Sequence, residues 1–332
     1  MTGRERIISI INRKNPDRSG FWIGNPTAPA LELYCGRFGV GDLLGLSAYA
    51  GDDLIWINAE RILYDHPKEV FQFTKPGTDI PFFYDTEDAL DVERAYWPDP
   101  GKLDFTRIKD KLVRARATGK AVFSGMWSGF WHHFHSVFGF ENCFIKMYTA
   151  PAVVEAAGER FAEYYLECNR RIFTEHRDKI DACFIGNDMG TQNDCMISPE
   201  MYRRFVFPYL KRLVAQAKSF GLPLALHSCG SIDRIIPDLI GMGVDILHPI
   251  QARARGMEAE TLQREYGGEI IFMGGLDTQD ILPFKSPGEV YAEVMRLRGI
   301  FGKYYIMSPS HEALLNNVPP ENFDAMCRAA VK

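Results

Sequence analysis

The chain has 332 residues, of which 46% are hydrophobic and 24% charged, with a formal net charge of −5. This composition suits a globular protein with a sizeable core, and it gives no sign of a nucleic-acid partner. No segment approaches the roughly 20 consecutive apolar residues of a membrane span, and seven scattered cysteines without a CxxC pair favour a reduced, cytoplasmic protein.

The N-terminal third predicts a helix, two strands and an irregular segment. The helix is expected over residues 4–12, where isoleucines recur on one face, and forms an N-terminal extension. Short strands are expected at residues 21–23 and 53–58. Residues 68–98 are aromatic and charged without a clear period, which indicates an irregular insertion.

Strand and helix patterns alternate from residue 102 onward. Strands are expected at residues 120–124, 181–185, 223–226, 244–247, 269–273 and 304–307. Helices are expected at residues 105–118, 150–177, 199–219, 232–242, 258–266, 287–301 and 320–331. Alternation of this kind predicts a parallel sheet with helical crossovers. With about eight strands we expect an α/β fold, a single (β/α)8 (TIM) barrel domain spanning residues 1–332, with an open doubly wound sheet as the alternative.

Polar residues collect where the predicted strands end, which is where a TIM barrel carries its active site. This concentration favours an enzyme. We expect Asp188 and His311 to be catalytic. Five further residues are candidates for substrate binding: Asn25, Asn187, Gln192, His248 and Asp277.

The pair His227 and Cys229 follows the fifth strand in the segment LHSCG. Residues two apart on a strand share a face, so imidazole and thiolate can both point into the barrel and suit zinc. A catalytic zinc needs a third protein ligand. His311 is the leading candidate, with His248, Asp277 and Glu312 as rivals. The alternative is a small buried cysteine beside a locally hydrogen-bonded histidine.

Two other segments have two interpretations each. Asn187 and Asp188 can act as base, proton donor or clamp for a polar ring, or they can brace the loop. The segment WSGFWHHFHSVFGF, residues 127–140, can cover the substrate, or it can be an aromatic helix packed on the barrel. The second interpretation is favoured, because adjacent histidines do not share a helix face.

Several segments resemble the uroporphyrinogen decarboxylase superfamily, which includes cobalamin-associated methyltransferases. They are ERIISIINRKNPDR, IGNDMGTQNDCMISPEMYRRFVFPYLKRLV, LHSCGSIDRIIPDLIGMGVDILHPIQ, FMGGLDTQDIL and SPSHEALLNNVPPENF. The resemblance implies a (β/α)8 barrel. Decarboxylases of the family carry an arginine-rich loop after the first strand and an aspartate after the second. Here these places read Gly24-Asn25-Pro26-Thr27 and Asn58-Ala59.

The methyltransferase branch is the better match. Its His-x-Cys pair and a cysteine near the eighth strand bind zinc, and here Ser310-His311-Glu312 stands in the cysteine's place. The resemblance implies methyl transfer between a corrinoid (cobalamin), carried on a separate protein, and a thiol or tetrahydrofolate-type acceptor. It also implies a homodimer. The alternatives are a decarboxylase of a carboxylated substrate and a non-catalytic partner of a corrinoid protein.

Overall fold

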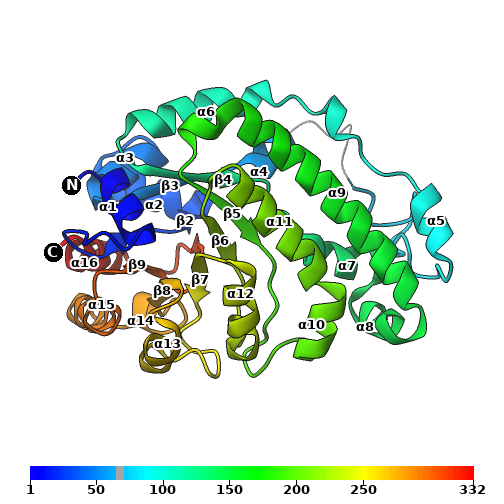
Figure 1. Ribbon diagram of the computed structural model, residues 1–332. Coiled ribbons are helices and arrows are strands. Elements are labelled where there is room, and N and C mark those ends of the chain that lie inside the picture. The colour runs from blue at the N-terminus through cyan, green and yellow to red at the C-terminus, as the bar shows by residue number, and fades with distance from the viewer. Residues whose placement is uncertain (65–70) are drawn as a thin grey trace.

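The computed structural model describes residues 1–64 and 71–332. Within these residues eight parallel strands form one sheet in the order β1-β9-β8-β7-β6-β5-β4-β3 (Figure 1). The strands are β1 (Gly20–Phe21), β3 (Leu54–Asn58), β4 (Ala121–Gly125), β5 (Ala182–Gly186), β6 (Leu224–His227), β7 (Ile246–Ile250), β8 (Ile271–Leu276) and β9 (Tyr305–Pro309). This arrangement is a nearly closed barrel, so the predicted (β/α)8 fold is confirmed.

The barrel closes between β1 and β3 through one aspartate. The Asp53 N–H donates to the Phe21 carbonyl at 2.8 Å, and the Phe21 N–H donates to Asp53 Oδ2 at 2.9 Å. Arg6 and Arg18 pair with the same carboxylate. Two hydrogen bonds and two ion pairs therefore bridge the edge that lacks a regular strand ladder.

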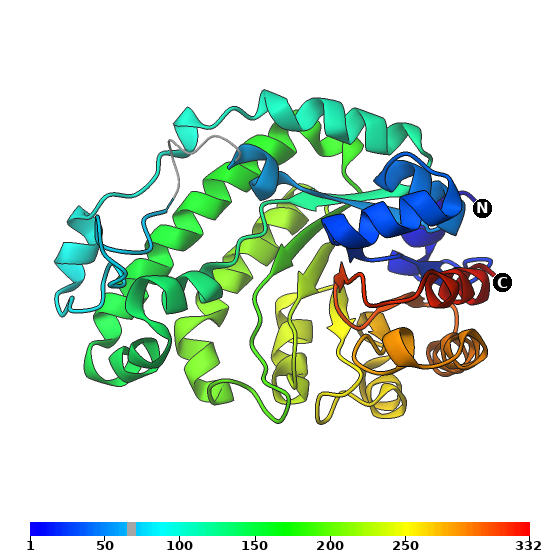
Figure 2. The same ribbon diagram turned by 180° about the vertical axis from the view of Figure 1, so that it is seen from behind.

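Helices surround the sheet, as Figures 1 and 2 show from opposite sides. The expected ones are α6 (Thr106–Ala117), α9 (Pro151–His176), α12 (Ile236–Met242), α13 (Ala259–Tyr266), α15 (Pro287–Phe301) and α16 (Pro320–Val331). Others had no counterpart in the sequence prediction: α2 (Ala28–Phe38), α3 (Leu43–Ala50), α4 (Ala59–Leu63), α8 (Phe140–Thr149) and α14 (Ile281–Phe284). None of the helices within the described ranges is long and apolar enough to cross a bilayer.

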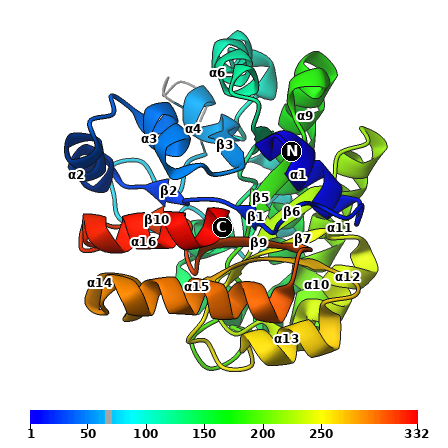
Figure 3. The same cartoon turned by 90° about the vertical axis from the view of Figure 1, so that its left-hand side faces the viewer.

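Helix α1 (Gly3–Ile11) lies across the end of the barrel where the strands begin (Figure 3). Its Ile7 and Ile10 are fully buried and join the cluster that fills the barrel, including Trp22, Phe123 and Phe184. Burying these two side chains contributes about 1.5–3 kcal/mol each. The N-terminal extension therefore plugs the end opposite the expected site.

Two helices differ in their bounds from the sequence prediction. The helix expected at residues 199–219 is two helices, α10 (Pro199–Phe205) and α11 (Phe207–Ser219), because Pro208 has no N–H to continue α10. The helix expected from residue 232 begins at Ile236, after a 3₁₀ turn at Asp233–Ile235.

The expected insertion is irregular where it is described. It contains one antiparallel bridge, Thr74 to Pro81, and α5 (Ala89–Arg94), which packs against α9 far from the termini (Figures 1 and 2). Residues 68–70 of the predicted insertion lie outside the described residues.

Candidate functional site

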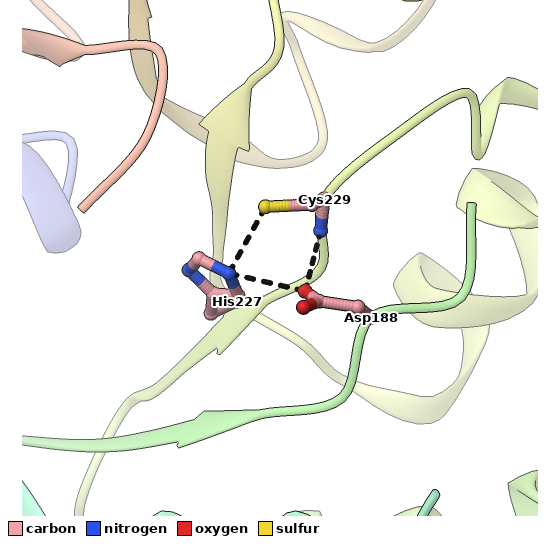
Figure 4. Close-up of side chains that lie close together, drawn as sticks. All are labelled: Asp188, His227 and Cys229. Atoms are coloured by element: carbon pink, nitrogen blue, oxygen red, sulfur yellow. Dashed lines mark hydrogen bonds and ion pairs between the residues drawn. The ribbon is translucent and has the colours of Figure 1, made fainter. Parts of the chain in front are cut away.

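Asp188, His227 and Cys229 converge where β5 and β6 end (Figure 4). His227 Nε2 lies 3.2 Å from Cys229 Sγ and 3.1 Å from Asp188 Oδ1. The Cys229 N–H also donates to Asp188 Oδ1 at 2.9 Å. A thiol and a carboxylate therefore share one ring nitrogen of a buried histidine.

His248, in the middle of β7, lies behind His227. The two Nδ1 atoms are 3.0 Å apart, and both rings are almost completely buried. Trp127 covers the other side of His227, with ring centroids 5.1 Å apart. This indole needs a glycine beneath it, because a Cβ on Gly186 would lie 1.9 Å from Trp127 Cζ2. The ring of His227 is thus fixed from both sides.

The segment after β9 brings Glu312 and His311 to the same point. Glu312 Oε2 lies 3.6 Å from His227 Nε2 and 3.2 Å from His311 Nδ1. The backbone here is held by a two-stranded sheet of β2 (Asn25–Pro26) and β10 (Ala313–Leu314). Gly24 permits it, since its φ is +82° and a Cβ would meet the Glu312 carbonyl at 2.9 Å.

The charges of this cluster are strongly coupled. Burial opposes ionisation of His227, but attraction from Cys229 and the hydrogen bonds with Asp188 and Cys229 outweigh it, so the pKa of His227 is raised well above its usual value. Burial likewise opposes ionisation of Asp188, but hydrogen bonds from His132 and His227 hold its pKa far below the usual range. Burial lowers the pKa of His248 well below its usual value. The acidic groups around His227 Nε2 therefore favour a positive charge at this point.

A bound zinc ion would supply this positive charge. Cys229 Sγ belongs to two groups of potential ligands, one with Asp188 and His227 and one with His311 and Glu312, each with atoms within 4.8 Å of one another. Tetrahedral zinc with bonds of 2.0–2.3 Å places its ligands about 3.3–3.6 Å apart, close to the 3.2 and 3.6 Å found for His227 with Cys229 and Glu312. Glu312 Oε2 is also buried without a hydrogen-bond partner in the described part of the chain. These residues fit a zinc site.

Two cavities flank the cluster. One, of about 390 Å³, is lined by Trp56, Asn58, Glu60, Arg61, Tyr64, Trp127, His132, Asp188, His227 and Glu312. The other, of about 250 Å³, is lined by Gln251, Thr278, Gln279, Ser310, His311, Ala313, Leu314, Leu315, Asn317 and Val318. The first is acidic and aromatic, and the second is lined by uncharged polar and aliphatic side chains together with His311. The metal-ligand candidates lie between two spaces of different chemistry.

Helix α7 (Phe130–Phe138) contributes residues that the sequence interpretation did not assign to the site. It is the predicted aromatic helix, with Phe130, Trp131 and Phe134 buried. His132 Nε2 nevertheless lies 3.1 Å from Asp188 Oδ2, and His133 Nε2 is 2.5 Å from the Tyr165 hydroxyl. The two adjacent histidines, His132 and His133, shortly after a predicted strand end were the sequence signal that could have placed this helix at the site. The adjacent rings contact different partners rather than one ion.

Four predicted substrate-binding residues lie outside the cluster or are already engaged. Asn25 borders a separate cavity of about 20 Å³, and Gln192 is exposed in a loop. Asn187 is fully buried; its Oδ1 accepts from the Trp131 N–H and its Nδ2 donates to the Ser128 carbonyl, which braces the start of α7. Asp277 accepts from Arg253 and from the Gln279 N–H. Their roles in substrate binding stay predictions.

Comparison with known families decides the relationship. The model of the family "Uroporphyrinogen decarboxylase (URO-D)" matches residues 74–332. The chain belongs to the uroporphyrinogen decarboxylase family. The matched region contains all the cluster residues, from His132 on α7 to Glu312 after β9.

Two relatives from Methanosarcina mazei are similar to this member of the family. The methylated-thiol–coenzyme M methyltransferase is 30% identical over 96 residues, which are 29% of this chain and 24% of that protein. A solved methyltransferase structure superposes with a TM-score of 0.74 at 14% identity, covering 100% of this chain and 98% of the other.

A more distant fold match is an intracellular xylanase from Thermoanaerobacterium saccharolyticum. Its TM-score is 0.50 at 9% identity, with 98% of each chain covered. At these identities both structural matches establish the barrel fold alone.

Proposed function

We propose that the protein transfers a methyl group between a corrinoid, carried on a separate protein, and a small thiol. The observation that carries the proposal is the position of His227 Nε2, which lies 3.2 Å from Cys229 Sγ and 3.6 Å from Glu312 Oε2 and borders the cavity of about 390 Å³. The similarity to a methylated-thiol methyltransferase supports the same reaction class. The chain shares only a short segment with that relative, so substrate and partner are part of the proposal.

Bound zinc would supply Lewis-acid chemistry, lowering the pKa of an acceptor thiol so that it reacts as thiolate. His227 and Cys229 would hold the ion, with Glu312 as third ligand in place of a cysteine. His248 would accept from the remaining ring N–H of His227, which fixes the ring's orientation. Asp188 and Trp127 would hold the site's shape and limit water.

The cavity's charge supports methyl transfer over decarboxylation. Among its lining residues are three carboxyl groups, Glu60, Asp188 and Glu312, and one arginine, Arg61. A substrate with many carboxylates needs several cationic partners, since bidentate arginine is what binds carboxylates well. The arginine-rich loop is also missing after β1, where β2 carries Asn25. A decarboxylase of a polyanionic substrate is therefore the weaker proposal.

A thiol suits the site better than a tetrahydrofolate-type acceptor held by Asn187 and Asp188. Both side-chain atoms of Asn187 are engaged in the protein. Both oxygens of Asp188 are engaged as well, with His132 on one side and with His227 and the Cys229 N–H on the other. These contacts leave the two side chains fewer donors and acceptors to offer a pterin ring.

The test is a methyl-transfer assay with methylcobalamin as donor and coenzyme M or 2-mercaptoethanol as acceptor. We expect thioether formation by the zinc-loaded protein and its loss, by more than about 100-fold, in Cys229→Ser. Cys195→Ser is the matched control, because Cys195 lies in a loop outside both cavities. Binding of a methylated corrinoid without turnover would instead indicate a non-catalytic partner. Absence of both would contradict the proposal.

A further inference from the structure

Glu60 projects into the same cavity as the metal-ligand candidates but is not one of them. It lies on α4, directly after β3, and lines the 390 Å³ cavity with Asp188, His227 and Glu312. Its Oε2 accepts from the Ser128 N–H at 3.2 Å, and its Oε1 accepts from the Tyr165 hydroxyl at 3.2 Å. The carboxyl group is therefore held in place, with the cavity on one side and α9 on the other.

A chain of hydrogen bonds continues behind Glu60. The Tyr165 hydroxyl is also 2.5 Å from His133 Nε2, on α7. His133 packs among Phe71, Phe73 and Phe161, and this burial lowers the pKa of its ring to about 3, so the ring is neutral. A neutral imidazole and a hydroxyl can each donate or accept. The hydrogen bonds can therefore be donated from His133 through Tyr165 to an ionised Glu60. They can also be donated from a protonated Glu60 through Tyr165 to His133.

We propose that Glu60 is the proton-exchanging catalytic residue of this site, with Tyr165 and His133 as positioning residues that accommodate either of its protonation states. The inference rests on the proposed thiol-dependent methyl transfer. Glu60 and His227 line the same cavity, so a substrate sulfur held beside His227 would share that cavity with Glu60. Asp188, by contrast, has both oxygens committed to His132, His227 and the Cys229 N–H.

The step balances as follows. The S–H bond of the thiol breaks and its proton passes to the Glu60 carboxylate. The thiolate attacks the methyl carbon of the corrinoid carrier, the S–C bond forms, and the carbon–cobalt bond breaks with both electrons staying on cobalt. In the reverse direction, cobalt takes the methyl group from a thioether, and protonated Glu60 returns the proton to the departing thiolate.

The surroundings of Glu60 suit this exchange near neutrality. Burial raises the pKa of Glu60 to about 7, although the Ser128 N–H and the Tyr165 hydroxyl act in the opposite direction. A general base works best when its pKa lies near the working pH. Titratable groups face Glu60 from several neighbouring elements. They are Arg61 on α4 and Tyr64 just after it, His132 and His133 on α7, Tyr164, Tyr165 and Cys168 on α9, Asp188 after β5, His227 on β6 and Glu312 after β9.

The test counts protons released when a thiol binds, and needs no turnover. Coenzyme M and 2-mercaptoethanol are titrated into the zinc-loaded protein by calorimetry at about pH 8, in two buffers of different ionisation enthalpy. At this pH Glu60 is ionised before the thiol binds, because its pKa is about 7, and the charge of the bound thiolate should raise that pKa. Glu60 then keeps the thiol proton, so we expect the native protein to release fewer protons than Glu60→Gln, which should release about one. Glu141→Gln, an exposed change on α8, should behave as native.

Tyr165→Phe provides a second variant should Glu60→Gln fail to fold. The Tyr165 hydroxyl favours ionised Glu60, so its loss should raise the pKa of Glu60. The pH at which the variant changes from releasing to retaining the thiol proton should then be higher than in the native protein. A role in packing alone would not move this pH.

The proposal is overturned if the native protein and Glu60→Gln release the same number of protons, if Tyr165→Phe leaves the pH of the change where it was, or if neither thiol binds. These results are separate from the methyl-transfer assay. Proton retention without methyl transfer would refute the proposed function and leave the role of Glu60 standing. Methyl transfer together with equal proton release by the native protein and Glu60→Gln would support the proposed function and refute the role of Glu60.

Discussion

His132 and His133 are neighbours on α7, yet their rings contact two different networks. His132 Nε2 lies 3.1 Å from Asp188 Oδ2, whereas His133 Nε2 lies 2.5 Å from the Tyr165 hydroxyl that donates to Glu60. Residues one apart on a helix point about 100° apart. One turn of α7 therefore supports the metal-ligand cluster and the buried carboxyl group at the same time.

His132→Ala should weaken metal binding without abolishing it. His132 hydrogen-bonds to Asp188, which in turn contacts His227 Nε2 and the Cys229 N–H. Removing such an outer partner typically costs about 10–100-fold in metal affinity. Competition with a chromophoric chelator measures the affinity. His135→Ala is the control, since His135 packs among Trp131, Phe140 and Phe144 on the same helix; equal affinities in the two variants would contradict the expectation.

Glu312→Gln should reduce zinc affinity more than His311→Ala does. Glu312 Oε2 is buried and lies 3.6 Å from His227 Nε2. His311 is 44% exposed, and its Nδ1 already accepts from the Ala313 N–H at 3.0 Å, which leaves only its Nε2 for a metal. We expect a loss of at least about 100-fold for Glu312→Gln and less than about tenfold for His311→Ala. The reverse order would make His311, as first predicted from the sequence, the third ligand.

Glu60 should make the folded protein less stable as pH rises. Its pKa is raised by burial to about 7 in the folded chain, above its ordinary value of 4.5. A raised pKa means that the folded state holds the proton more tightly, so this stabilisation is complete below about pH 4.5 and is lost as pH rises through about 7. The shift corresponds to at most about 3 kcal/mol.

Urea unfolding at several pH values measures this effect. Native protein should lose free energy of unfolding between about pH 4.5 and 8 relative to Glu60→Gln, and Glu141→Gln should follow the native curve. Parallel curves for native protein and Glu60→Gln would show that Glu60 has an ordinary pKa.

Lys120→Met should destabilise the barrel. Lys120 Nζ forms an ion pair with Asp52 and donates to the carbonyls of Ser47 at 2.9 Å and Asp52 at 2.7 Å. Asp52 is buried, and burial raises its pKa to about 6 even with Lys120 present. Removing one partner of a buried pair costs about 3–5 kcal/mol. Thermal unfolding should show a smaller loss of stability for the double variant Lys120→Met/Asp52→Asn than for Lys120→Met. An equal loss would mean that the unpaired charge of Asp52 is not the cause of the destabilisation.

Much of the barrel was predictable because parallel strands buried on both faces appear as short apolar runs, separated by helical patterns. The break at Val206 was missed, although Pro208 marks it, because the apolar stripe continues on both sides. The helices α2 and α3 fell in a segment whose pattern was not assigned.

The site was predictable in part, for a similar reason. His227, Cys229 and Asp188 stand at strand ends, so topology alone brings them together. Whether Glu312 or His311 is better placed to bind a metal depends on a backbone turn held by β2 and β10. The pKa of Glu60 depends in part on Tyr165, which is 105 positions away in the chain. Such tertiary contacts leave no local pattern in the sequence.

Metal content tests the central claim most directly. Protein purified without a histidine tag, and its Cys229→Ser variant, would be analysed by mass spectrometry beside the Cys195→Ser control. The proposed site predicts about one zinc per chain in the native protein and the control, and loss of that zinc in Cys229→Ser. Absence of zinc from the native protein, or full retention in Cys229→Ser, would contradict a zinc centre at His227 and Cys229.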